Sequence, residues 1–123
     1  MYFYAIDVDT VGNLYGSDYC AVYMLEYSAD GTATWKVVAG TPWSAGFSGD
    51  GGPATFSQLS YVQDIALDAS ANVYIADYNN CRVRLVTKST GKITTIAGNG
   101  VGDLTDAGDG GPAMHATTGK PSR

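Results

Sequence analysis

Short stretches of alternating or continuous apolar residues run through this chain, and they predict β-strands. Residues 64–68 read Asp-Ile-Ala-Leu-Asp, the period-two pattern of a strand with two different faces. Residues 73–76 are continuously apolar, which favours a strand buried on both sides. Similar patterns separated by turn residues predict six more strands, over residues 5–9, 14–17, 22–27, 34–39, 82–87 and 92–97.

The strand predicted over residues 82–87 carries charge. Strand geometry places Val83 and Leu85 on one face, with Arg82 and Arg84 on the other. We therefore expect this strand to be half exposed, with both arginines on its solvent side.

The chain also contains an internal repeat. Residues 49–54 read Gly-Asp-Gly-Gly-Pro-Ala, and the same six letters return 59 positions later, at residues 108–113. A fixed long period indicates a solenoid, a propeller or an array. Each repeat holds four predicted strands, an antiparallel meander that must stack on others to bury its faces, and radial stacking of such sheets gives a β-propeller. The predicted fold class is all-β, with two four-stranded antiparallel blades.

Several segments resemble the NHL-repeat family of β-propellers. They are the Asp-x-x-x-Asn-Val-Tyr-Ile-Ala-Asp stretch ending at Asp77, the Arg-Val-Arg run of residues 82–84, the Ile-Thr-Thr-Ile-Ala-Gly-Asn-Gly run of residues 93–100, and residues 108–113. The second repeat resembles the family over residues 64–113, whereas the first departs after Asp18. It lacks the asparagine and arginine that, by this resemblance, form a hydrogen-bond network fastening the turn between the second and third strands.

We divide the chain into a first blade (residues 1–40), an inter-blade loop (41–61), a second blade (62–98) and a connector with a tail (99–123). Because a closed propeller needs about four to eight blades, this chain alone does not close a ring. Two explanations stand: the chain is a fragment of a longer propeller, or further copies or a protein partner supply the other blades.

Strand parity in a meander places the two long connections and the turns after Asp18 and Asp77 on one face, the top face. Long loops are often functional, so we take the following residues as candidate binding residues: Tyr19, Trp43, Phe47, Asp50, Tyr78, Asn79, Asn80, Arg82 and Asp109.

The aromatic residues of the first long loop, Trp43, Phe47 and Phe56, have two readings. They can anchor a partner at an interface, or they can fold back to cover the edge of a blade.

The Gly-Asp-Gly-Gly-Pro-Ala motif also has two readings. Its aspartates, Asp50 and Asp109, can contribute to a calcium site, although such a site needs about six to eight oxygens and each copy offers one carboxylate. In the structural reading the aspartates bond to backbone N–H groups of their own glycine turns, and Pro53 or Pro112 begins a short helical turn. We expect the structural role and no cofactor.

Composition fits this picture and narrows the partners. The 123 residues include 16 glycines and nine tyrosines, suited to many strands joined by tight turns. The formal charge of −5 would repel a phosphate backbone, so we expect no nucleic-acid partner. No apolar stretch approaches the ~20 residues that span a bilayer, so we expect no membrane insertion. The sequence does not indicate a compartment.

Catalytic residues are scarce. Some propellers related to the family are metal-dependent lyases or lactonases, whose sites collect several His, Glu and Asp side chains, whereas this chain has one histidine, His115, and one glutamate, Glu26. The leading interpretation is a non-enzymatic segment that acts in binding or assembly through its top-face loops. The alternatives are a fragment of a propeller enzyme and a structural subunit that completes a larger assembly.

Overall fold

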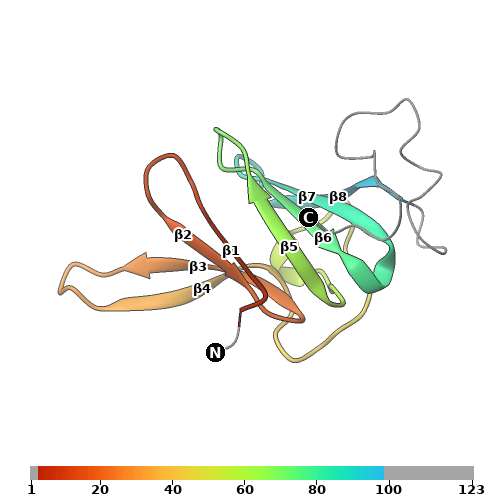
Figure 1. Ribbon diagram of the computed structural model, residues 1–123, viewed down its shortest axis with the longest axis horizontal. Helices are drawn as coiled ribbons and strands as arrows, with labels where there is room; N and C mark the ends of the chain where they lie inside the picture. The colour runs from red at the N-terminus through yellow and green to blue at the C-terminus, as the bar shows by residue number, and fades with distance from the viewer. Residues whose placement is uncertain (1–2, 99–123) are drawn as a thin grey trace.

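The computed structural model describes residues 3–98, and these form two four-stranded antiparallel sheets, so the all-β prediction is confirmed (Figure 1). The first sheet has the order β1-β2-β3-β4 and the second β5-β6-β7-β8, with neighbouring strands joined in sequence. No closed barrel forms within the described range. The strands are β1 (Ala5–Val8), β2 (Leu14–Ser17), β3 (Ala21–Tyr27), β4 (Ala33–Gly40), β5 (Val62–Leu67), β6 (Val73–Asp77), β7 (Arg82–Thr87) and β8 (Lys92–Ala97).

All eight predicted strands are present, with small differences at their ends. The largest is at β5, which begins at Val62, two residues before the predicted start. Two 3-10 helices, η1 (Ala54–Phe56) and η2 (Tyr78–Asn80), interrupt the connections, and η1 directly follows Pro53 as the sequence predicts. Across residues 3–98 no helix has the length and hydropathy to span a membrane.

The strand pairing identifies equivalent positions in the two sheets. Gly16 and Ile75 are 59 positions apart and take the same place in the second strand of their sheets. Gly16 pairs with Tyr23, whereas Ile75 pairs with Arg84. Tyr23 is therefore the structural equivalent of Arg84. Both residues directly follow a register irregularity at the start of the third strand.

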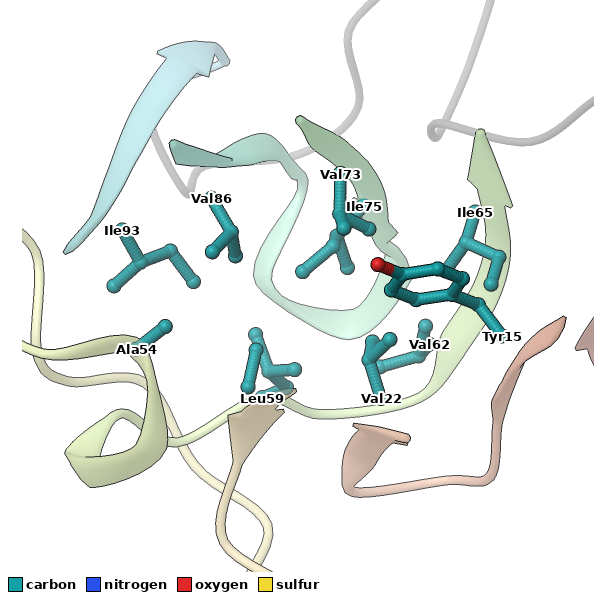
Figure 2. Close-up of a cluster of buried hydrophobic side chains, with 11 residues drawn as sticks. Tyr15, Val22, Ala54, Leu59, Val62, Ile65, Val73, Ile75, Val86 and Ile93 are labelled. Atoms are coloured by element: carbon teal, nitrogen blue, oxygen red, sulfur yellow. The ribbon is translucent and has the colours of Figure 1, made fainter. Parts of the chain in front are cut away.

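The two sheets stack face to face and share one hydrophobic core (Figure 2). Their first strands, β1 and β5, lie side by side (Figure 1), and the backbone N–H of Leu67 donates to Asp7 Oδ2 at 3.0 Å. The second sheet contributes one face to the core, which we name its front face. The core side chains are Tyr15, Val22 and Ala39 from the first sheet, Ala54 and Leu59 from the loop, and Val62, Ile65, Val73, Ile75, Val86 and Ile93 from the second sheet.

The first sheet packs on the second with its opposite face, the one that carries Tyr15 and Val22. Its own front face, defined by the positions equivalent to those on the front face of the second sheet, points away from this contact. That front face comprises Ile6, Val8, Leu14, Gly16, Tyr23, Leu25 and Trp35.

Candidate functional site

The loop between the sheets crosses to the outer edge of the second sheet before it returns to β5. The Gly51 N–H donates to the Ile93 carbonyl at 2.7 Å, and the Ile93 N–H donates to the Gly52 carbonyl at 3.1 Å. The Ala54 N–H donates to the Gly91 carbonyl at 2.8 Å. The repeated motif thus continues the second sheet past β8 and covers the start of an edge that would otherwise be open.

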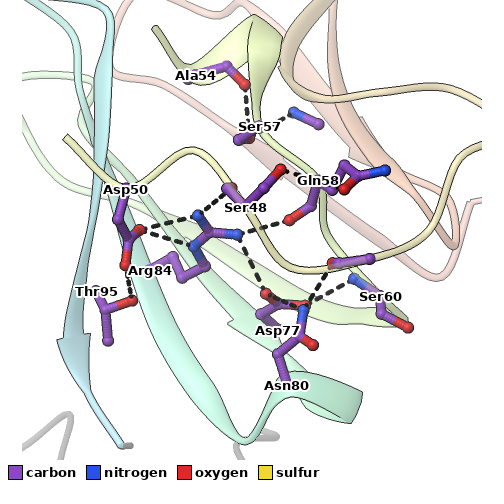
Figure 3. A network of polar contacts seen from close by, with 12 residues as sticks. Ser48, Asp50, Ala54, Ser57, Gln58, Ser60, Asp77, Asn80, Arg84 and Thr95 are labelled. Atoms are coloured by element: carbon purple, nitrogen blue, oxygen red, sulfur yellow. Dashed lines mark hydrogen bonds and ion pairs between the residues drawn. The ribbon is translucent and has the colours of Figure 1, made fainter. Parts of the chain in front are cut away.

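Arg84 lies at the centre of the contact between this loop and the second sheet (Figure 3). Its side chain is fully buried, and its guanidinium donates to the carbonyls of Gln58 at 2.7 Å and Ser48 at 2.8 Å. It also pairs with Asp50 Oδ1, through Nη2 at 2.9 Å and Nε at 3.2 Å. The expectation that Arg84 faces solvent is wrong, because the crossing loop covers this face of β7.

Asp77 is the second carboxylate near Arg84 and is fully buried, with Arg84 Nη1 at 3.4 Å from Oδ2. The Ser60 N–H donates to Oδ1 at 2.8 Å, and Asn80 Nδ2 donates to Oδ2 at 2.8 Å and to the Gly46 carbonyl at 2.9 Å. Burial raises the pKa of Asp77, while these donors and Arg84 act in the opposite direction.

Asn80 and Arg84 both contact Asp77 at the end of β6, and Arg84 also holds the crossing loop. We name the set Arg84, Asp50, Asp77 and Asn80 the Arg84 clamp.

Asp50 does not bond to its own glycine turn, so that structural expectation is wrong. One carboxylate oxygen accepts from Arg84, and the other accepts from the Thr95 hydroxyl at 2.5 Å (Figure 3). Both partners belong to the second sheet. The backbone turn is closed instead by the Gly52 N–H, which donates to the Gly49 carbonyl at 2.9 Å. The aspartate therefore fastens the loop to the next sheet.

The first sheet has a different arrangement at the equivalent place. Asp18 Oδ1 accepts from the N–H groups of Cys20 and Ala21 at 3.0 and 2.9 Å, and Oδ2 accepts from the Tyr23 hydroxyl at 2.9 Å. Tyr23 thus replaces Arg84 as the side chain that meets the aspartate. The Phe3 ring lies over this region, with its centroid 6.0 Å from that of Tyr23.

A cluster of four tyrosines, which we name the tyrosine cluster, lies where the two sheets meet on the predicted top face. Tyr19 and Tyr61 stack with parallel rings 5.5 Å apart, and Tyr4 and Tyr78 pack against Tyr61 at 5.5 and 5.2 Å. Asn79 Nδ2 donates to the Tyr19 hydroxyl at 2.8 Å. Because Tyr4 and Tyr19 belong to the first unit, Tyr61 to the end of the loop and Tyr78 to the second unit, the cluster joins the two units.

The loop aromatics divide between the two readings. Phe47 folds back on the second sheet, where the guanidinium carbons of Arg82 and Arg84 lie 4.0 and 4.8 Å from its ring centroid. Trp43 is 98% exposed and Phe56 is 77% exposed, so neither covers the blade.

The candidate residues therefore form two groups and one outlier. Asp50 and Asn80 belong to the Arg84 clamp, beside Phe47 and Arg82. Tyr19, Tyr78 and Asn79 belong to the tyrosine cluster, and Trp43 joins neither. Asp109, with the second copy of the motif and His115, lies outside the described residues.

Sequence reasoning missed Arg84, Asp77 and Tyr61, although Arg84 and Asp77 each left a signal. Val86 shares the strand parity of Arg84, and grouping these two would have placed Arg84 on the buried face. Asp77 recurs as Asp18 in the first repeat, directly after a strand, and a repeated acid there indicates a buried partner.

A cleft between the sheets is lined by core side chains such as Tyr15 and Val73, together with Lys36 and Lys88. No candidate residue of the described part of the chain lines it. Within residues 3–98, no three His, Cys, Asp or Glu side chains gather in a way that would hold a metal ion. Compared with known proteins, the chain matches no protein-family model, and no curated protein is significantly similar to it.

Proposed function

We propose that this chain is a non-enzymatic assembly module. It consists of two consecutive blades of an NHL-type propeller, and further polypeptide, from a protein partner or from further copies, completes the ring. The role of the chain is to present sheet faces that a neighbouring blade covers.

One observation carries the proposal: equivalent apolar residues are buried in one sheet and exposed in the other. Ile65 is 1% exposed on the front face of the second sheet, because the first sheet covers it. Ile6 takes the same place in the first sheet and is 59% exposed, and its neighbour Val8 is 54% exposed. The first sheet thus lacks, among residues 3–98, the cover that it provides for the second.

Covering this face would release apolar surface from water. Complete burial of a Val or Ile side chain contributes about 1.5–3 kcal/mol, and roughly half of that remains to be gained at Ile6 and Val8. A contact of a front face with the opposite face of another sheet is head-to-tail, so repeated contacts either close a ring or form an open chain. Both properties fit an assembly module.

The experiment is light scattering over a range of concentrations, combined with binding of a dye that reports exposed apolar surface. We expect concentration-dependent association and dye binding by the wild-type chain. Replacing Ile6 and Val8 by serine should reduce both without loss of strand signal in circular dichroism.

Val11→Ser is the matched control, because Val11 is 81% exposed in a turn outside the front face. It should leave association and dye binding unchanged. A strictly monomeric chain that binds no dye would contradict the proposed function.

A further inference from the structure

The cleft between the two sheets is built from one row of side chains on each sheet. On the first sheet, the strand pairing places Tyr15 beside Met24 and Met24 beside Lys36, on the face that packs on the second sheet. On the second sheet, Val73 pairs with Val86 on the front face. Both rows line the cleft, whose volume is about 240 Å³. Pockets for drug-sized molecules have about 300–1,000 Å³, so this cleft suits a smaller ligand.

Two lysines give the cleft a positive charge. Lys36 ends the row of the first sheet, and Lys88 lies on the opposite wall, two positions after Val86. Lys88 forms no ion pair within residues 3–98. Lys36 pairs with Glu26 at 3.7 Å, with both side chains more than half exposed. Because such an exposed pair is weak, both ammonium groups can bind an anion.

Tyr15 lies at the other end of the first row. Two strand spacings of ~4.8 Å separate it from Lys36, so their Cα atoms are about 10 Å apart. The Tyr15 side chain is 1% exposed, its hydroxyl points toward Val73 (Figure 2), and this hydroxyl forms no hydrogen bond within residues 3–98. A buried hydroxyl without a partner is unfavourable, and an oxygen atom of a ligand would satisfy it.

The charge at this end of the cleft differs from that at the lysines. Burial, and then the Asp9 carboxylate, raise the pKa of Tyr15, so its hydroxyl keeps the proton and can donate. The Asp9 charge also disfavours a second negative charge beside Tyr15. The cleft thus favours an anionic group at one end and a neutral oxygen at the other.

The equivalent row of the second sheet lacks both features. It consists of Tyr74, Leu85 and Thr94, so a threonine stands in the place of Lys36. The Tyr74 hydroxyl donates to Asp68 Oδ2 at 3.5 Å, whereas the Tyr15 hydroxyl has no such partner. Because the same strands form without them, the fold alone does not account for the lysine and the unpartnered hydroxyl.

We propose that this cleft binds a small carboxylate with an apolar chain and a neutral oxygen at its far end, as in a medium-chain ω-hydroxy acid. Lys36 and Lys88 hold the carboxylate. The chain lies between Met24 and Val86, and the far oxygen accepts a hydrogen bond from the Tyr15 hydroxyl. The site does not depend on the proposed assembly role, because both walls belong to this chain.

The probe is 8-hydroxyoctanoate, titrated into the full chain and followed by amide NMR shifts. Two matched ligands isolate its ends: 1,8-octanediol lacks the carboxylate, and octanoate lacks the far oxygen. We expect saturable shifts at cleft residues such as Val38 and Val73. We also expect 8-hydroxyoctanoate to bind at least about fivefold tighter than the diol and about threefold tighter than octanoate.

Variants test each end of the cleft separately. Lys36→Gln combined with Lys88→Gln should remove the preference over the diol. Tyr15→Phe should remove the preference over octanoate and keep that over the diol. Lys92→Gln is the matched control, because Lys92 is exposed on the second sheet and does not line the cleft. It should leave both preferences unchanged.

Three results would overturn the inference. They are the absence of saturable shifts, equal affinity for the three ligands, and shifts confined to the front face around Ile6 and Val8. The last result would show that the apolar chain binds the exposed sheet face and not the cleft. Circular dichroism of each variant checks that a lost preference does not come from unfolding.

Discussion

Asp9 and Asp68 hold the turn between the first two strands of each sheet through the same set of hydrogen bonds. In the second sheet, Asp68 Oδ1 accepts from the N–H groups of Ser70 and Asn72 at 2.9 Å each, and Oδ2 accepts from Asn72 Nδ2 at 3.0 Å. In the first sheet Asn13 donates to Asp9 in the same way. A short polar side chain thus replaces backbone partners at each reversal.

These bonds predict the acid behaviour of Asp68. The Asn72 side chain, then the N–H groups of Asn72 and Ser70, hold the pKa of Asp68 below its ordinary value of 3.8 against the effect of burial. The stabilisation is therefore present above pH 3.8 and is lost as the pH falls through the lower folded-state pKa. Asn72→Ala should raise the pKa of Asp68 toward 3.8 and weaken this acid dependence, as measured by carboxyl carbon NMR titration. The control Asn13→Ala should leave the Asp68 titration unchanged, and an unshifted Asp68 in Asn72→Ala would contradict the assignment.

Arg84 should be the most sensitive polar side chain of the described part. Arg84→Ala leaves Asp77 buried without its charge partner and releases the loop at Asp50, so we expect a loss of about 3–5 kcal/mol in the free energy of unfolding. Urea denaturation measures it. Arg84→Lys keeps the charge but not the planar fork and should recover only part of the loss. A loss below about 1 kcal/mol for Arg84→Ala would contradict the central role of the clamp.

At the scale of the elements, the loop between the sheets leaves β4 through a sharp reversal at Gly40. Gly40 has φ +85°, and a Cβ there would collide with the Cys20 carbonyl oxygen and lie 2.9 Å from Ala21 Cα. The close approach brings the end of β4 against the start of β3 and directs the chain toward the second sheet. The path of the loop therefore begins with a constraint that only glycine meets.

Gly12 provides a matched comparison, since it has φ +96° in the turn after β1 but open space where a methyl group would be added, with no atom within 4 Å. Gly12→Ala should cost only the backbone strain, about 1–2 kcal/mol. Gly40→Ala should cost about 1–3 kcal/mol more because its methyl group overlaps backbone atoms. Thermal or urea unfolding of the two variants tests this, and equal losses would show that β3 moves aside without cost.

The strands were predictable from the sequence because each is a local pattern bounded by turn residues. The period-two alternation of residues 64–68 and the apolar run of residues 73–76 both became strands of the second sheet. The face of β7 was not predictable in the same way. A simple alternation would bury Val83 and expose Arg84. Both are buried, because a loop from elsewhere in the chain crosses the strand and covers the arginine.

At the scale of the whole molecule, the sequence indicated where the candidate site residues lie along the chain, but not which residues they contact. The turn residues and the long loop indicated Asp50 and Asn80, but Asp50 meets Arg84 34 positions away, and Asn80 meets Asp77 three positions away and Gly46 34 positions away. A contact over 34 positions depends on the path of the loop that joins the two sheets, and the loop lies beside the stacking of the sheets in the same core. The same stacking leaves the front face of the first sheet, with Ile6 and Val8, open to solvent.

The two tryptophans of the chain can report which surface is used in assembly. Trp35 is half-buried on the front face of the first sheet, with its ring 4.7 Å from that of Phe3, whereas Trp43 is 98% exposed in the loop. In Trp43→Phe, the emission of Trp35 should shift to shorter wavelength and resist quenching by acrylamide as concentration rises, because a neighbouring sheet excludes water from it. In Trp35→Phe, the emission of Trp43 should stay unchanged over the same range. The opposite pattern, a protected Trp43 and an unchanged Trp35, would place the contact on the top-face loops and would contradict assembly through the sheet face.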